Sequence, residues 1–191
     1  MQDFLFYLQL GWEHIISKDA LDHQLFILAL IAIFSFRDWK KVLILVTAFT
    51  IGHSLTLVLS ALDAFRFPSD WVEFLIPCTI VFTALDNIIF SKNEKKLIQL
   101  NYYLALLFGL IHGMGFANSV RMMLANEQDI TLPLFGFNVG LELGQIAVVA
   151  IALFLHYIFS EVLKLSNKIW IYIISVPIFI FALKMALERI P

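Results

Sequence analysis

Charged residues and cysteine are both scarce in this chain. Only 15% of its 191 residues are charged, and the formal net charge is −2. We therefore expect no nucleic-acid partner, and no lysine or arginine block is long enough to bind anionic lipid headgroups. The single cysteine, Cys78, can form no intrachain disulfide and cannot build a thiolate metal site. The sequence also lacks an HExxH motif and the inverted repeat found in many secondary transporters.

Apolar residues, by contrast, are abundant. They make up 61% of the chain, against about 45–50% in soluble domains. A helix needs about 20 apolar residues to cross a bilayer core of about 30 Å. The apolar runs cover residues 21–36, 40–62, 70–91, 101–123, 132–159 and 168–189. We therefore expect an all-α fold, a polytopic transmembrane bundle of six helices that forms a single transmembrane domain over residues 1–191.

The N-terminal part of the chain does not fit this scheme directly. Residues 3–17 form an amphipathic or partly embedded segment. The run at 21–36 is the one run shorter than a full span. The bundle has seven helices if residues 3–17 are counted, and the sequence leaves open whether this segment crosses the membrane.

The loops indicate an orientation, because lysine and arginine in short loops prefer the cytoplasmic side. The loops "RDWKK" (37–41) and "SKNEKK" (91–96) are basic, whereas "DAFRFPSDW" (63–71) and "RMMLANEQD" (121–129) are acidic or mixed. We assign the first pair to the cytoplasm and the second pair to the outside, together with "EHIISKDALDH" near the N-terminus.

Several polar side chains lie inside the apolar runs. An ionisable group at the centre of a transmembrane helix costs about 2.5–3.5 kcal/mol, so each one is a candidate for function. Counted inward from the outer helix ends at 1.5 Å per residue, His53, Glu142 and His112 lie at depths of about 14, 15 and 17 Å. These three residues should therefore share one layer. Asp22 and His23 enter from the same side, and we expect them to lie nearer the outer surface.

Histidine and carboxylate together suit a divalent transition metal, zinc or nickel. Asn138, Glu142 and Gln145 fall on one helical stripe and Thr50 and His53 on another, and both stripes should face the bundle interior. The expected metal ligands are His14, Asp22, His23, His53, His112 and Glu142. The expected supporting residues around them are Asn138, Gln145, Thr50 and Ser54.

Each of these residues also has a purely structural explanation. A neutral histidine at position 53 or 112 could be a core residue that is hydrogen-bonded to a carbonyl. Asp22 could cap the first helix, and Asn138 and Gln145 could form interhelical hydrogen bonds, which are common in membrane bundles.

Four stretches of the sequence resemble the successive motifs of the HupE/UreJ family of bacterial membrane proteins. They are "GWEHIISKDALDHQLFILAL", "TAFTIGHSLTLVLSAL", "FGLIHGMGFANSV" and "GFNVGLELGQIAVVA", which together cover residues 11–155. The resemblance implies a multi-pass protein of the bacterial inner membrane that acts as a nickel permease. By this resemblance, the family's first histidine motif corresponds to His14, Asp22 and His23, and its later histidine motif corresponds to His112. His53 and Glu142 match the branch with "FTxxHSxTL" and "GFNxGxExGQ".

The sequence leaves three functions open. In the first, a metal permease, Asp22 and His23 capture a cation from the outside and His53, His112 and Glu142 hold it. The second is a zinc-dependent intramembrane hydrolase, with Glu142 or Asp22 as general base and Ser54 orienting water or substrate. The third is an accessory or structural subunit. The expected partners are the lipid bilayer and a metal ion or small substrate, and the oligomeric state stays open, a homo-oligomer included.

Overall fold

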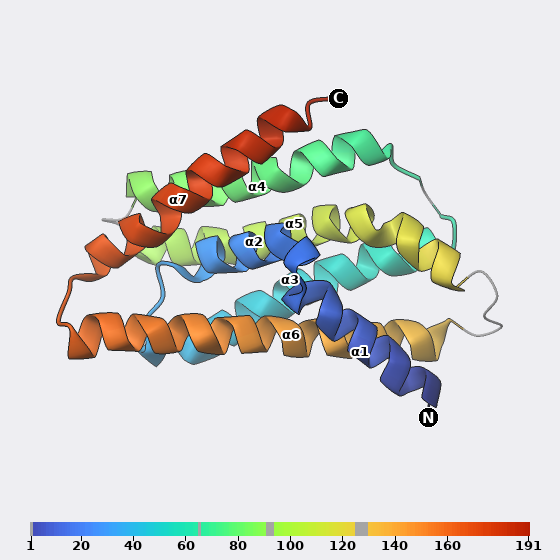
Figure 1. Ribbon diagram of the computed structural model, residues 1–191, viewed down its shortest axis with the longest axis horizontal. Coiled ribbons are helices and arrows are strands. Elements are labelled where there is room, and N and C mark those ends of the chain that lie inside the picture. Colours follow the sequence, from blue (N-terminus) through green and yellow to red (C-terminus); the bar gives the residue numbers. More distant parts are fainter. Residues whose placement is uncertain (1, 65, 91–93, 125–129) are drawn as a thin grey trace.

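The computed structural model describes residues 2–64, 66–90, 94–124 and 130–191, and within these residues the chain is helical and contains no strand. Seven α-helices follow one another in the described residues: α1 Gln2–Ile16, α2 Leu21–Ile31, α3 Trp39–Ala61, α4 Ser69–Phe90, α5 Glu94–Leu124, α6 Thr131–Tyr157 and α7 Asn167–Glu188. The long helices lie along the long axis of the molecule and are joined alternately at its two ends (Figure 1). We call the end with residues 62–68 the outer end and the end with residues 32–38 the inner end, following the charge pattern of the loops.

Four stretches of the described residues are long and apolar enough to cross a membrane. They are Phe36–Ala61, Ser69–Ile89, Thr131–Val162 and Asn167–Glu188. The expectation of six spanning helices is therefore not confirmed. Of the other helices, α1 and α2 have 15 and 11 residues, fewer than the roughly 20 that a span requires. Helix α5 has 31 residues, which is long enough to cross a membrane, but some of its side chains lie outside the described residues in which these stretches were identified.

Helices α1 and α2 are two half-helices that together run from the outer end of the molecule to its inner end. Helix α1 rises from the outer end to the middle of the molecule, where α2 begins and continues to the inner end (Figure 1). The break between them contains the short 3₁₀ turn Lys18–Ala20. This corrects the expectation that "EHIISKDALDH" lies at the outer surface, because 15 helical residues carry the chain about 22 Å inward before the break.

Glycines allow two helix pairs to approach closely. Helix α1 packs on α6, where a Cβ at Gly140 would collide with the carbonyl oxygen of Leu8. Helix α3 packs on α5, where a Cβ at Gly113 would collide with Thr56 and with the backbone of His53. Small residues that let transmembrane backbones touch are typical of such pairs. The close packing brings α1 and α3, the helices that carry His14 and His53, against the α6 and α5 backbones.

Candidate metal centre

Three histidines from three different helices converge in the middle of the bundle. His14 is on α1, His23 on α2 and His53 on α3, and one ring nitrogen of each lies within 4.8 Å of the others. The ring centroids of His14 and His23 are 4.7 Å apart, and each lies about 6 Å from that of His53, at 5.8 and 5.9 Å. Three imidazole nitrogens at this spacing could bind one metal ion together.

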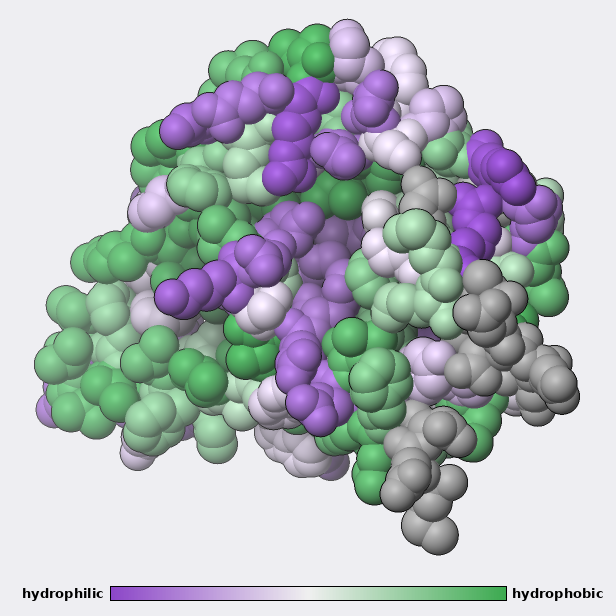
Figure 2. Space-filling view, turned by 45° about the vertical axis from the view of Figure 1, so that its right-hand side comes forward, coloured by the Kyte–Doolittle hydropathy of each residue, from purple (hydrophilic) through white to green (hydrophobic). Residues whose placement is uncertain are grey.

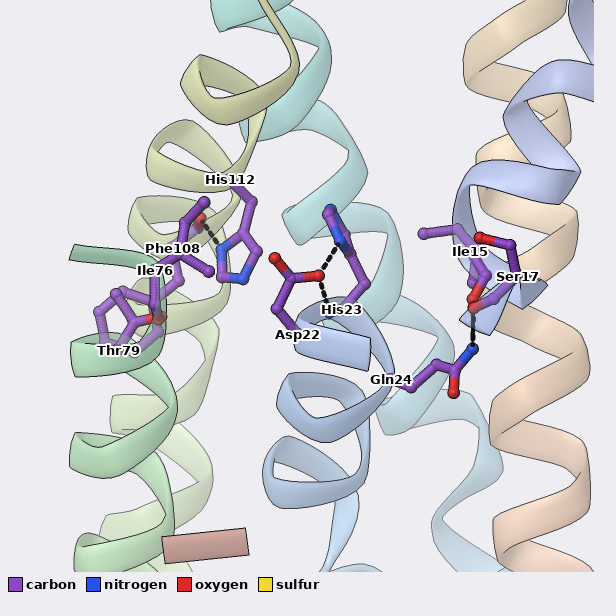
Figure 3. A network of polar contacts seen from close by, with 9 residues as sticks. All are labelled: Ile15, Ser17, Asp22, His23, Gln24, Ile76, Thr79, Phe108 and His112. Carbon is purple, nitrogen blue, oxygen red and sulfur yellow. Dashed lines mark hydrogen bonds and ion pairs between the residues drawn. The ribbon is translucent and has the colours of Figure 1, made fainter. Parts of the chain in front are cut away.

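Hydrogen bonds fix the ring of His23 and that of a fourth histidine, His112. The Nδ1–H of His23 donates to Oδ1 of Asp22 at 2.9 Å, and the Nδ1–H of His112 donates to the carbonyl of Phe108 at 2.8 Å (Figure 3). A carboxylate and a carbonyl can only accept, so these partners assign the proton to Nδ1 and leave the lone pair on Nε2. Second partners of this kind usually orient metal-binding histidines.

Five of the six remaining ring nitrogens of these four histidines are buried and unpaired. Among the described residues, Nε2 of His14, Nε2 of His23, Nε2 of His112 and both nitrogens of His53 have no hydrogen-bond partner. Leaving a buried polar group unsatisfied costs about 1–3 kcal/mol, and native structures contain few such groups. A cluster of five such nitrogens therefore needs an explanation, and the donor set fits a borderline transition-metal ion.

His112 and Asp22 lie beside the three converging histidines and not among them. The ring centroid of His112 is 5.0 Å from that of His23, and its side chain is 1% exposed. Asp22 also accepts the backbone N–H of His23 at 2.8 Å. The structure thus places the whole "DH" pair next to His112, in the same layer and not nearer the outer surface as we expected from the sequence.

Phenylalanines close the centre on its inner side. Phe26, Phe49 and Phe108 each lie about one helical turn inward of His23, His53 and His112, respectively. The ring of Phe26 lies 5.1 Å from that of Phe49 and 5.6 Å from that of Phe108. All three rings are buried. We call these three residues the phenylalanine floor.

A cavity connects the centre to the outer end. It has a volume of about 290 Å³ and begins at His14, His23 and His112. It extends to Glu73 near the start of α4 and to Arg189 just after α7. Figure 2, turned so that the outer end comes forward, shows hydrophilic residues gathered in a hollow of the surface. The cavity therefore leads from the outer end to the rings of His14, His23 and His112.

The predicted polar stripe of α6, Asn138, Glu142 and Gln145, contacts α3 and does not point toward the three converging histidines. Glu142 accepts a hydrogen bond from Thr47 at 2.6 Å, and the structure does not bring its carboxylate to the three histidines. Counting residues gives the depth of a side chain along the helix but not its direction around the helix axis. The polar stripe of α6 faces the side of α3 that carries Thr47. The supporting residues form the same ladder, in which Thr50 donates to Gln145 at 2.7 Å and Ser54 donates to Asn138 at 2.6 Å.

One residue that holds the break between α1 and α2 was not expected from the sequence. The Nε2 of Gln24 donates to the carbonyls of Ile15 and Ser17, at 2.9 and 3.0 Å (Figure 3). The last carbonyls of a helix have no partner within the helix, so Gln24 satisfies the end of α1 from the first turn of α2. A glutamine inside an apolar run, directly after the "DH" pair, was the signal that could have indicated it.

Comparison with known protein families identifies a match over nearly the whole chain. The model of the family described as HupE / UreJ protein matches residues 1–189, essentially the whole chain. No curated protein matches the chain, and no solved structure does.

Proposed function

We propose that this chain, which belongs to the HupE/UreJ family, is a metal permease. The family is associated with nickel and cobalt transport. The observation that carries the proposal is the convergence of His14, His23 and His53, whose unpaired nitrogens lie beside a cavity open to the outer end. The metal ion is then the cargo of the protein.

The donor set supports a transition metal of intermediate softness. Neutral imidazole suits nickel, zinc, copper and iron, and the centre offers no thiolate. The family association favours nickel or cobalt within this group. Zinc, the other metal expected from the sequence, has no such support. We therefore propose a nickel-type divalent cation as the substrate.

Incomplete ligation suits transport better than storage. A transported ion must bind well enough to enter and weakly enough to leave. Three protein nitrogens leave further positions for water, which the cavity can supply. The buried floor of Phe26, Phe49 and Phe108 lies between the centre and the inner end. We propose that the structure is the outward-open form of a multi-pass protein of the bacterial inner membrane, and that transport requires the floor to part.

The two other functions expected from the sequence receive less support. In the hydrolase, Glu142 or Asp22 would act as base beside Ser54. Glu142 and Ser54 instead take part in hydrogen bonds between α3 and α6. In a purely structural subunit, the polar layer would pair its hydrogen-bonding groups, whereas the histidines leave five buried nitrogens unpaired among the described residues.

Nickel uptake into proteoliposomes tests the proposal. His53→Ala removes a central ligand and should abolish uptake of labelled nickel. His156→Ala is the matched control, because His156 is also buried but lies at the inner end of α6, where its Nε2 lies 3.3 Å from Oδ1 of Asn167. Thermal unfolding of both variants shows whether they fold. Equal uptake by the two variants, or no uptake by the wild type, would count against the permease.

A further inference from the structure

We propose that Asp19 and Glu73, two exposed carboxylates that line the cavity, form a separate capture site there, which holds the divalent cation with its water shell before the histidines bind it. This inference rests on the proposed permease function and deepens it. It adds a first binding stage, in which the cation is held through its own water molecules. Neither residue belongs to the group of converging histidines.

The charge of the cavity supports such a site. Three carboxylates line the cavity, those of Asp19, Asp22 and Glu73, against the one guanidinium of Arg189, so the charged side chains sum to −2. Asp19 comes from the break between α1 and α2, and Glu73 from α4, and both are exposed. Within the described part of the chain, neither carboxylate takes part in an ion pair. A cleft lined by one sign of charge concentrates ions of the opposite sign.

Buried groups at the bottom of the same cavity point to a ligand. His23 and His112 line it and are 4% and 1% exposed, and the Nε2 of each is unpaired among the described residues. The acidic cavity therefore leads to lone pairs that can bind a metal. Exposed carboxylates elsewhere on the surface, such as that of Glu13, do not line this cavity.

The cavity is large enough for a hydrated ion, whereas the histidine centre is not, so binding has two stages. A water molecule occupies about 30 Å³ of liquid volume, so an octahedral ion with six waters displaces roughly 180 Å³. This hydrated ion fits within the cavity of about 290 Å³. The nitrogens of His14, His23 and His53 lie within 4.8 Å of one another, which leaves room for the ion but not for a full water shell. The cation can thus enter hydrated and exchange water for nitrogen at the bottom.

Carboxylates can hold a hydrated cation without displacing its waters. A bridging water between two groups is nearly as favourable in enthalpy as a direct hydrogen bond. Attraction between exposed charges is screened over about 8–10 Å at ordinary salt. Capture at Asp19 and Glu73 should therefore weaken as the salt concentration rises. The positive charge of Arg189 repels the cation, so the affinity of the capture site stays low enough for the cation to be released.

Hexamminecobalt(III) is a suitable probe, because it resembles a hydrated cation and its ammonia ligands do not exchange for imidazole. It should inhibit nickel uptake into wild-type proteoliposomes competitively. In the Asp19→Asn/Glu73→Gln variant, the KM for nickel should rise by about tenfold and the inhibition should disappear. Arg189→Gln should lower the KM. Glu13→Gln is the matched control and should change neither quantity, because Glu13 is exposed and hydrogen-bonded by Gln9 outside the cavity.

A second measurement separates this inference from the permease itself. His53→Ala should lose nickel binding in calorimetry but keep the binding of hexamminecobalt(III). If the wild type transports nickel but the double variant keeps the wild-type KM and the inhibition, the capture site is wrong and the permease stands. If the wild type binds no nickel at the histidines, the proposed function fails first. Unchanged KM values in the double variant and in Arg189→Gln together would overturn the capture site.

Discussion

Asp22 holds His23 through two hydrogen bonds that a single carboxylate oxygen accepts. Its Oδ1 accepts the backbone N–H of His23 at 2.8 Å and the ring Nδ1–H at 2.9 Å. The two bonds lock the ring against the first turn of α2. The Nε2 then remains free for the centre that His23 shares with His14 and His53.

Replacing Asp22 should weaken metal binding without removing a ligand nitrogen. Mutation of a partner that orients a metal-binding histidine typically costs 10–100-fold in affinity. We expect Asp22→Asn to weaken nickel binding by about this factor, because the amide keeps the shape but loses the charge. Calorimetry of the purified protein measures this. Asp70→Asn, at an exposed position on α4 outside the cavity, should bind like the wild type, and an unchanged affinity in Asp22→Asn would contradict the role of Asp22.

Gln24 should stabilise the break between α1 and α2. Gln24→Leu leaves the carbonyls of Ile15 and Ser17 without this donor, and an unsatisfied carbonyl costs about 1–3 kcal/mol where it is buried. We expect faster hydrogen exchange in the residues around the break and weaker nickel binding. Gln9→Leu, which loses only an exposed bond to Glu13, is the control. Equal exchange in the two variants would show that Gln24 does not hold the break.

The packing of α1 on α6 should position His14. A Cβ at Gly140 would collide with the Leu8 carbonyl and would approach the backbone nitrogen of Trp12. We therefore expect Gly140→Ala to destabilise the fold by about 1–3 kcal/mol and to weaken nickel binding. Leu143→Ala, on an exposed position of the same helix, should do neither. Thermal unfolding in detergent and calorimetry report the two effects separately.

The phenylalanine floor should prevent leakage. Phe49 contacts His53 and Phe26, with ring centroids 6.1 and 5.1 Å away, and is 1% exposed. Phe49→Leu keeps an apolar side chain but opens the floor, so nickel should escape faster from loaded proteoliposomes. Phe154→Leu, at a side chain on α6 that is 57% exposed, is the control. Identical leakage in the two variants would mean that the barrier lies elsewhere.

The long helices could be predicted well from hydrophobicity because lipid and core both require apolar side chains. The run 40–62 corresponds to α3 at Trp39–Ala61, and 168–189 to α7 at Asn167–Glu188. The run 21–36 was misleading. Its helix ends at Ile31, but the chain stays apolar through a buried turn in which Phe34 is 2% exposed. Hydrophobicity reports burial, so it does not mark where a buried helix stops.

The candidate site could be predicted in part. The polar residues of the "DH" pair and of the His53 and His112 segments were visible as costly groups in apolar runs. Depth along a helix follows from residue counting, but the direction of a side chain around the helix depends on packing. Gly140 places α1 against α6, and the opposite stripe of α6, with Glu142, consequently meets Thr47. The glycines at 136, 140 and 144 mark this packing face of α6 in the sequence, but the sequence does not show which helix packs on it.

X-ray absorption at the nickel edge tests the central claim most directly. The measurement uses the purified protein loaded with one equivalent of nickel, together with His14→Ala and the control His156→Ala. The three converging histidines predict imidazole scattering from three rings in the wild type and in His156→Ala, and from two in His14→Ala. A nickel ion surrounded only by oxygen, or a spectrum that does not change in His14→Ala, would contradict the account.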